Sequence, residues 1–214
     1  MYALFLTSFP HIWCGNYATA NAQSDECVAL ADEKGALLWK VLGMLVRGWL
    51  FAQLGKGSDA VQIITTGLSA FRSTGSTVFM PLWLSSLTRA YAELGQFDAA
   101  RRCIGEAMRA IEATKEKWCE AEIYRIAGEI ALLSPEPDAA KAEAYFERAL
   151  AVARQQQAKS WELRAATSLA RLWRNQGKPQ QARELLAPVY GWFTEGFDTR
   201  DLKEAGALLD ELHV

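Results

Sequence analysis

The sequence predicts an all-α protein built from about five helical hairpins stacked side by side, and three observations predict it. Glycines in matching contexts recur at Gly15, Gly55 and Gly95, which are forty residues apart, and again at Gly177. Small and large apolar residues occur at helical spacing on both sides of these glycines. In addition, 50% of the 214 residues are hydrophobic and 22% are charged, which is typical of a globular chain with a large core.

The clearest hairpin lies in the third repeat. Its predicted first helix carries large residues at Leu84, Leu87 and Tyr91, with helical spacing. Gly95 follows at the turn, where glycine ends a helix in the left-handed conformation without a Cβ clash. Small residues let the two helices approach closely, and large ones fill the space to the next hairpin. The predicted second helix places such residues at Ala100, Ile104 and Ala107.

The other four repeats keep parts of this pattern. The first repeat has Gly15, Tyr17 and Ala20, and the second has Gly48, Phe51, Gly55, Ala60 and Ile64. The fourth repeat has a longer turn, Ser134 to Asp138, between Tyr124, Ala127, Gly128 and Ala142, Phe146, Ala149. The fifth repeat has Leu169, Ala170, Trp173, Gly177, Pro179, Ala182 and Leu186.

These repeats are predicted to form one domain over residues 1–214. Each hairpin has an apolar face that only a neighbouring hairpin covers, so the repeats must stack. Their predicted boundaries are 1–35, 36–75, 76–115, 116–158 and 159–197. A last helix within 198–214 has charges on one face, as a terminal cap does, and on the other Leu202, Ala205, Leu208, Leu209 and Leu212.

The third repeat resembles the tetratricopeptide repeat (TPR) position by position. This resemblance implies a right-handed α-solenoid of about five TPR-like hairpins plus a C-terminal capping helix. The usual repeat is about 34 residues long, whereas this one is about 40. The longer period and the closing run from Leu186 to Leu212 resemble the C-terminal helical repeats of bacterial AAA-type ATPase/adenylate cyclase and MalT-like signalling proteins.

The charge, the N-terminus and the cysteines exclude several classes of protein. A net charge of -2 and a pI near 5.8 argue against nucleic-acid binding. The first residues lack the basic region of a signal peptide, and Lys40 and Arg47 interrupt the most apolar stretch, so we predict a cytoplasmic protein that does not enter a membrane. The thiols lack the close local pairs typical of metal sites, so we predict reduced cysteines and no metal at Cys14, Cys27, Cys103 and Cys119.

An enzyme is not predicted, because no catalytic pattern is complete. Lys56 follows Gly55, but the spacing of a phosphate-binding loop is absent. His11 and Cys14 are three residues apart, yet no orienting residue accompanies them, and His213 is next to the C-terminus. We therefore predict no catalytic residue and no cofactor.

Two candidate binding surfaces follow from the TPR resemblance, which implies that the first helix of each hairpin lines a concave groove. In the C-terminal half this places an arginine cluster there, formed by Arg89, Arg125, Arg164, Arg171 and Arg174. Such arginines can grip the carboxylates of an acidic partner. The alternative is a solvated face with ion pairs inside the protein, such as Arg125 with Glu129.

The N-terminal half maps to an apolar groove, which is unusual on a soluble monomer. Its candidate interface residues are Tyr2, Phe5, Phe9, Ile12, Leu45 and Trp49. Three explanations remain open. The chain is the end of a longer array, it self-associates through this surface, or the groove takes an amphipathic helix or apolar peptide.

The sequence thus predicts a scaffold for protein–protein interaction and assembly. The family resemblance implies the C-terminal repeat module of a bacterial signalling or regulatory protein. The alternative is a ligand- or peptide-sensing domain that controls an attached ATPase, cyclase or transcription factor. The expected partner is a protein or peptide, or a second copy of the chain.

Overall fold

The computed structural model describes residues 1–212, so His213 and Val214 at the end of the predicted capping segment lie outside the described residues. The described residues form eleven α-helices and no strand. The predicted all-α fold class is confirmed. The helices are α1 (Tyr2–Cys14), α2 (Tyr17–Glu33), α3 (Leu37–Gln53), α4 (Gly57–Ser73), α5 (Met80–Glu93), α6 (Phe97–Thr114), α7 (Glu120–Leu133), α8 (Ala139–Gln155), α9 (Lys159–Asn175), α10 (Pro179–Tyr190) and α11 (Arg200–Glu211).

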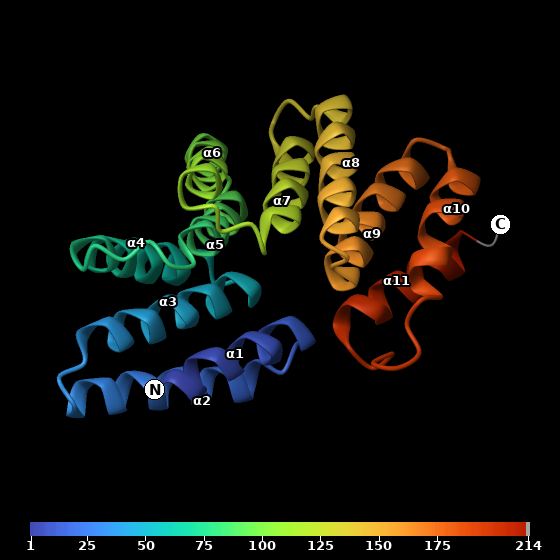
Figure 1. Ribbon diagram of the computed structural model, residues 1–214. Helices are drawn as coiled ribbons and strands as arrows, with labels where there is room; N and C mark the ends of the chain where they lie inside the picture. The colour runs from blue at the N-terminus through green and yellow to red at the C-terminus, as the bar shows by residue number, and fades with distance from the viewer. Residues whose placement is uncertain (213–214) are drawn as a thin grey trace. The chain divides into compact units, whose positions relative to one another are not determined.

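The chain divides into two compact units, Met1–Glu116 and Lys117–Val214, called unit 1 and unit 2. Unit 1 contains the hairpins α1/α2, α3/α4 and α5/α6, coloured blue to green in Figure 1. Unit 2 contains α7/α8 and α9/α10, followed by α11. The division falls next to the predicted boundary between the third and fourth repeats. That all five repeats act as a single domain stays a prediction.

Hairpins stack in the same way within each unit. In unit 1, α2 packs against α3 and α4 packs against α5, while the first helices α1, α3 and α5 contact one another in order. In unit 2, α8 packs against α9, and the first helices α7 and α9 are neighbours. α11 contacts both α9 and α10, so it takes the place that the first helix of another hairpin would have.

The glycines that define the repeat end the first helices in the left-handed conformation. Gly55 has φ 72° and Gly95 has φ 71°. At Gly95, the glycine N–H donates to the carbonyl of Ala92 at 3.0 Å, and the Gln96 N–H donates to that of Tyr91 at 2.9 Å. This geometry satisfies two carbonyls that the helix end would leave unpaired. Each of these glycines therefore marks the end of a first helix because the turn requires a left-handed residue.

Glycines inside helices allow close packing of neighbouring helices. A Cβ at Gly48 would lie 2.5 Å from Cγ1 of Ile64, and a Cβ at Gly128 would overlap the ring of Phe146. Both partners are buried on the second helix of the same hairpin. These two glycines thus let the helices of a hairpin approach until a large side chain reaches the opposite backbone.

We expect Gly128→Val to destabilise unit 2 by about 1–3 kcal/mol, because the added methyl groups overpack the contact with Phe146. The matched control is Gly105→Val in α6, where a Cβ would meet only the end of the Arg109 side chain at 3.6 Å. That control should change stability by less than about 0.5 kcal/mol. Guanidinium denaturation followed by circular dichroism checks both values. Equal losses for the two variants would contradict the packing role of Gly128.

Two clusters of apolar residues hold unit 2 together. The larger one includes Phe146 from α8, Leu163 and Leu169 from α9, and Leu186 from α10. α11 adds to it the apolar face that the sequence predicted for a cap, namely Leu202, Ala205, Leu208 and Leu212 as buried members and Leu209 as a partly buried one.

Among the described residues, none of the helices combines the length and apolarity that crossing a bilayer would need.

Candidate binding surfaces

Unit 2 brings together four of the five predicted arginines. Arg125 lies on α7, whereas Arg164, Arg171 and Arg174 lie on α9. α9 lies between α7 and α11 in the row of first helices, with contacts to both. The fifth residue, Arg89, belongs to α5 in unit 1 and is partly buried. The arginine face of unit 2 is therefore a feature of α9 with one contribution from α7.

Arg125 is buried and paired on both sides. Its Nε and Nη2 donate to the two carboxylate oxygens of Glu122 at 2.7 and 2.8 Å, which is a bidentate pair. Nη1 donates to Glu129 and, at 3.3 Å, to the hydroxyl of Ser168. Burial alone would lower the pKa of Arg125, but the carboxylates of Glu122 and Glu129 raise it overall. Arg125 is thus a permanently charged part of the interior.

The α9 arginines pair with acidic residues on both neighbouring helices. Arg164 reaches Glu122 on α7 at 3.0 Å and Asp201 on α11 at 3.8 Å. Arg171 pairs with Glu204 on α11 at 3.0 Å. Each pair crosses from α9 to the next first helix. The positive face of α9 is neutralised by the two helices that flank it.

Arg174, also on α9, pairs with Glu211 of α11. With it, all four predicted arginines in unit 2 have carboxylate partners inside the protein. Of the two interpretations that the sequence left open, these contacts match intra-protein ion pairs, including the predicted pair of Arg125 with Glu129. A role for these arginines in binding a partner stays a prediction that requires the α11 contacts to be broken.

A second buried carboxylate lies at the start of α9. Glu162 accepts from Nζ of Lys159 at 2.7 Å and from Nε of Arg154 at 2.9 Å. Burial raises the pKa of Glu162, but these two hydrogen bonds and charges lower it overall. Sequence reasoning missed this residue, although acidic and basic residues three apart on one helix are a recognisable signal.

In unit 1 the predicted apolar groove is not open, and this corrects the sequence-based expectation. Of the six candidate interface residues, Tyr2 is exposed, and the others are buried, namely Phe5, Phe9, Ile12, Leu45 and Trp49. Phe5, Phe9 and Trp49 lie in a cluster of aromatic rings between α1, α3 and α5. The ring centroids of Phe5 and Phe9 are 5.1 Å apart, and those of Phe9 and Trp49 are 5.2 Å apart.

The connection between α4 and α5 closes this cluster. It places Phe79 against α1, with ring centroids 5.5 Å from Phe5 and 5.4 Å from Phe9. Phe79 has φ 58°, and its N–H donates to the two carboxylate oxygens of Glu116 at 3.0 and 2.9 Å. The Glu116 contacts help to hold a backbone conformation that a residue with a large side chain rarely adopts. Phe79 and the fully buried Trp83 were missed from the sequence.

Four of the six exposed large apolar residues of unit 1 lie where the first helices begin, whereas Leu54 and Leu94 lie where α3 and α5 end. Tyr2 and Leu37 are 65% and 59% exposed, and Leu38 and Val78 are also exposed. The Tyr2 ring contacts the ring of Trp39 at a centroid distance of 5.9 Å, which joins the starts of α1 and α3. We call Tyr2, Leu37, Leu38 and Val78 the apolar edge.

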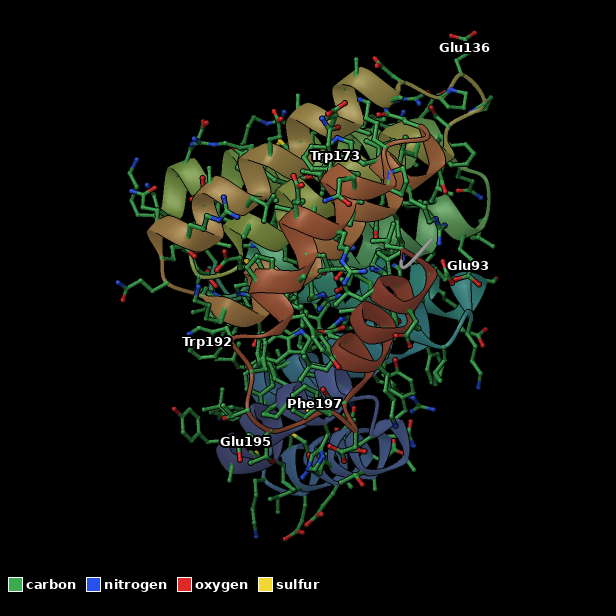
Figure 2. All side chains as sticks on the ribbon, turned by 90° about the vertical axis from the view of Figure 1, so that its right-hand side faces the viewer. Glu93, Glu136, Trp173, Trp192, Glu195 and Phe197 are labelled. Carbon is green, nitrogen blue, oxygen red and sulfur yellow. The ribbon has the colours of Figure 1, made fainter. Side chains whose placement is uncertain are left out.

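Unit 2 exposes aromatic rings on the connection between α10 and α11. Trp192 and Phe197 lie there with Glu195 between them, as Figure 2 shows. Nζ of Lys159 is 5.7 Å from the centroid of Trp192, and Tyr190 packs against Phe197 at 5.6 Å. These contacts hold the two exposed rings against the helices of their own unit.

Comparison with known proteins yields structural neighbours only. No family model matches the chain, and no curated protein matches it. A point variant of a Podosopora anserina putative kinesin light chain with nearly identical TPR-like repeats has a TM-score of 0.60 and 16% identity, over 89% of this chain and 92% of that one. The hairpin fold is that of TPR-like repeats. Another structure with this description has a TM-score of 0.58 and 14% identity, over 99% and 96% of the two chains.

At these identities the likeness concerns the TPR-like fold alone. It supports the resemblance to tetratricopeptide repeats that the glycine spacing indicated. The narrower resemblance to bacterial cyclase-associated and MalT-like repeats stays a prediction.

Proposed function

We propose that this chain is a protein-interaction module that self-associates through the apolar edge of unit 1. Supporting this proposal, stacked TPR-like hairpins present the starts of successive first helices along one edge. There, four large apolar side chains are exposed. Self-association by a twofold axis would bury the same patch on both copies.

The apolar edge is the observation that carries the proposal. Its member Tyr2 contacts Trp39, whose ring in turn contacts the buried ring of Phe5 at a centroid distance of 6.1 Å, so Tyr2 loses little conformational freedom on binding. Tyr2 is the member that the sequence also predicted as an interface residue. The acidic and basic residues nearest to Leu37 are paired with one another, Lys34 with Glu33 and Lys40 with Asp32. An apolar partner surface therefore fits this edge better than a charged one.

We expect Leu37→Asp to weaken self-association of the full chain without changing its stability, because a carboxylate would be forced into an apolar contact. Sedimentation velocity over a range of concentrations measures the effect. Leu133→Asp in unit 2 is the matched control, since Leu133 is 61% exposed and Leu37 is 59% exposed. A wild-type chain that stays monomeric at all concentrations, or an equal effect of both variants, would contradict self-association through this edge.

The wider context is proposed from the family resemblance. A C-terminal repeat module of a bacterial signalling or regulatory protein would use such an edge to bring attached domains together. The alternative function, sensing of a ligand or peptide, is favoured by a cleft beside α6 that is lined by Arg101, Arg102 and Arg109. A rise of the melting temperature with added ligand, in a chain that stays monomeric, would support that alternative.

A further inference from the structure

A cleft of about 430 Å³ opens on unit 1 beside α6. The packed face of α6 carries Ala100, Ile104, Ala107 and Ile111, and the cleft lies on the remaining surface. Polar and charged residues line the cleft, including three arginines, the thiol of Cys103 and the hydroxyl of Tyr91. Those used below are Tyr91, Arg101, Arg102, Cys103, Gly105 and Arg109.

The cleft carries two positive charges without a counter-charge. Arg101 pairs with Asp98 at 2.6 Å, and Glu106, which also lines the cleft, pairs with Arg72 at 2.6 Å. Each of these pairs is neutral. Arg102 and Arg109 make no ion pair among residues 1–212. Each carries one positive charge, so together they give the cleft a charge of plus two. The α9 arginines differ, because each of them has a carboxylate partner.

Gly105 forms an open floor between the two arginines. Glycine weakens a helix relative to alanine, and Gly48 and Gly128 have packing reasons for it. Gly105 has no such reason, since a Cβ there would meet only Nη1 of Arg109, at 3.6 Å. The Arg109 guanidinium thus folds back by one turn to lie over Gly105, toward Arg102. Arg102 lines the same cleft, and the missing side chain of Gly105 leaves its surface open there.

Two further side chains supply hydrogen-bond donors. Burial raises the pKa of the Cys103 thiol, Glu106 raises it further, and Arg102 and Arg72 lower it by less. The thiol therefore stays protonated at neutral pH and can donate to an oxyanion. Tyr91 contributes a phenolic hydroxyl from α5.

We propose that this cleft binds a phosphate group, held by Arg102 and Arg109 above Gly105. A phosphate monoester has a charge close to minus two at neutral pH and three acceptor oxygens, which matches two arginines and additional donors. A carboxylate would balance one of the two charges only. The phosphate can come from a small molecule or from a phosphorylated side chain of a peptide. This proposal is independent of self-association through the apolar edge.

Isothermal titration of the full chain tests the proposal with three probes, at constant ionic strength. The probes are inorganic phosphate, phenyl phosphate, and a short phosphoserine peptide with its unphosphorylated twin. Arg102→Gln combined with Arg109→Gln should weaken binding by at least about tenfold, because charged hydrogen bonds are lost. Gly105→Val keeps both charges but places a side chain in the space that the phosphate would occupy. It should therefore weaken binding while the melting temperature stays unchanged.

The matched control is Lys141→Gln combined with Arg148→Gln on α8. Lys141 and Arg148 are seven residues apart, as Arg102 and Arg109 are, and replacing both removes the same charge. At the position that corresponds to Gly105, α8 has Ala144. The control should retain wild-type affinity. Binding of inorganic and phenyl phosphate as tight as that of the phosphopeptide indicates a small-molecule source. Tighter binding of the phosphopeptide than of its twin and of both free phosphates indicates a protein source.

Three results would overturn the proposal. One is a wild-type chain that binds none of the probes. Another is an equal loss of affinity in the two double variants, which would show a diffuse effect of net charge. The third is full affinity in Gly105→Val, which would show that the cleft floor has no part in binding. Melting curves by circular dichroism accompany each variant, so a loss of affinity through unfolding is recognised.

Discussion

Replacing Phe9 with alanine should destabilise unit 1 by about 3–5 kcal/mol, the range for removal of a buried aromatic side chain. Phe9 is only 5% exposed and lies at the centre of the aromatic cluster. Its ring centroid is 5.2 Å from that of Trp49, 5.4 Å from Phe79 and 5.7 Å from Trp13. These neighbours come from different elements and cannot all move inward, so a cavity would remain.

Guanidinium denaturation of the full chain, followed by tryptophan fluorescence and by circular dichroism, measures this loss. Thr7→Ala is the control from the same helix, since Thr7 is exposed and lies outside the apolar edge, and it should cost less than about 0.5 kcal/mol. A Phe9→Ala chain with wild-type stability but weaker self-association would contradict the buried position. It would instead support the prediction from the sequence that Phe9 is an interface residue.

The fold could be predicted from the sequence because its repeat is set by local rules. Gly55 and Gly95 are in the left-handed conformation where the turn requires it, and Gly128 lies where two helices approach. Each of these residues is recognisable from its neighbours in the chain. The same holds for α11, whose apolar residues recur at helical spacing on the face that the core covers.

The candidate surfaces could be predicted only in part. Whether their residues are exposed, buried or paired depends on contacts between distant segments of the chain. The groove positions of α1 were identified correctly as apolar, but Phe79 comes from the connection between α4 and α5, and its φ of 58° has no glycine to signal it. Likewise, the arginines of α9 were found, yet the pairing of Arg171 with Glu204 joins residues 33 positions apart. Helical spacing describes one helix and does not show which neighbour covers it.

The unpaired charges of α6 were missed for a related reason. The TPR resemblance directs attention to the first helices, whereas Arg102 and Arg109 lie on a second helix. One signal was available in the sequence. Gly105 interrupts an otherwise strong helix between two arginines, and no turn or repeat position explains it.

The second large effect is expected for Arg125→Met, which should destabilise unit 2 by about 3–5 kcal/mol. The substitution keeps much of the apolar stem but removes the charge that neutralises Glu122, a buried residue. Glu122 would still pair with Arg164 at 3.0 Å, but it would lose the bidentate pair with Arg125. The cost arises from leaving a buried carboxylate short of a partner, since an intact buried ion pair contributes little net stability.

Arg171→Met is the matched control, because it breaks an ion pair on the same row of helices whose side chains are 42% and 41% exposed. Water replaces the lost partner there, so the cost should be below about 1 kcal/mol. Adding Glu122→Gln to Arg125→Met should recover part of the loss, because the remaining amide is neutral. Urea denaturation of the three variants measures these differences. Equal losses for Arg125→Met and Arg171→Met would mean that solvent reaches both pairs, and the α7 network would then be an ordinary surface feature open to an acidic partner.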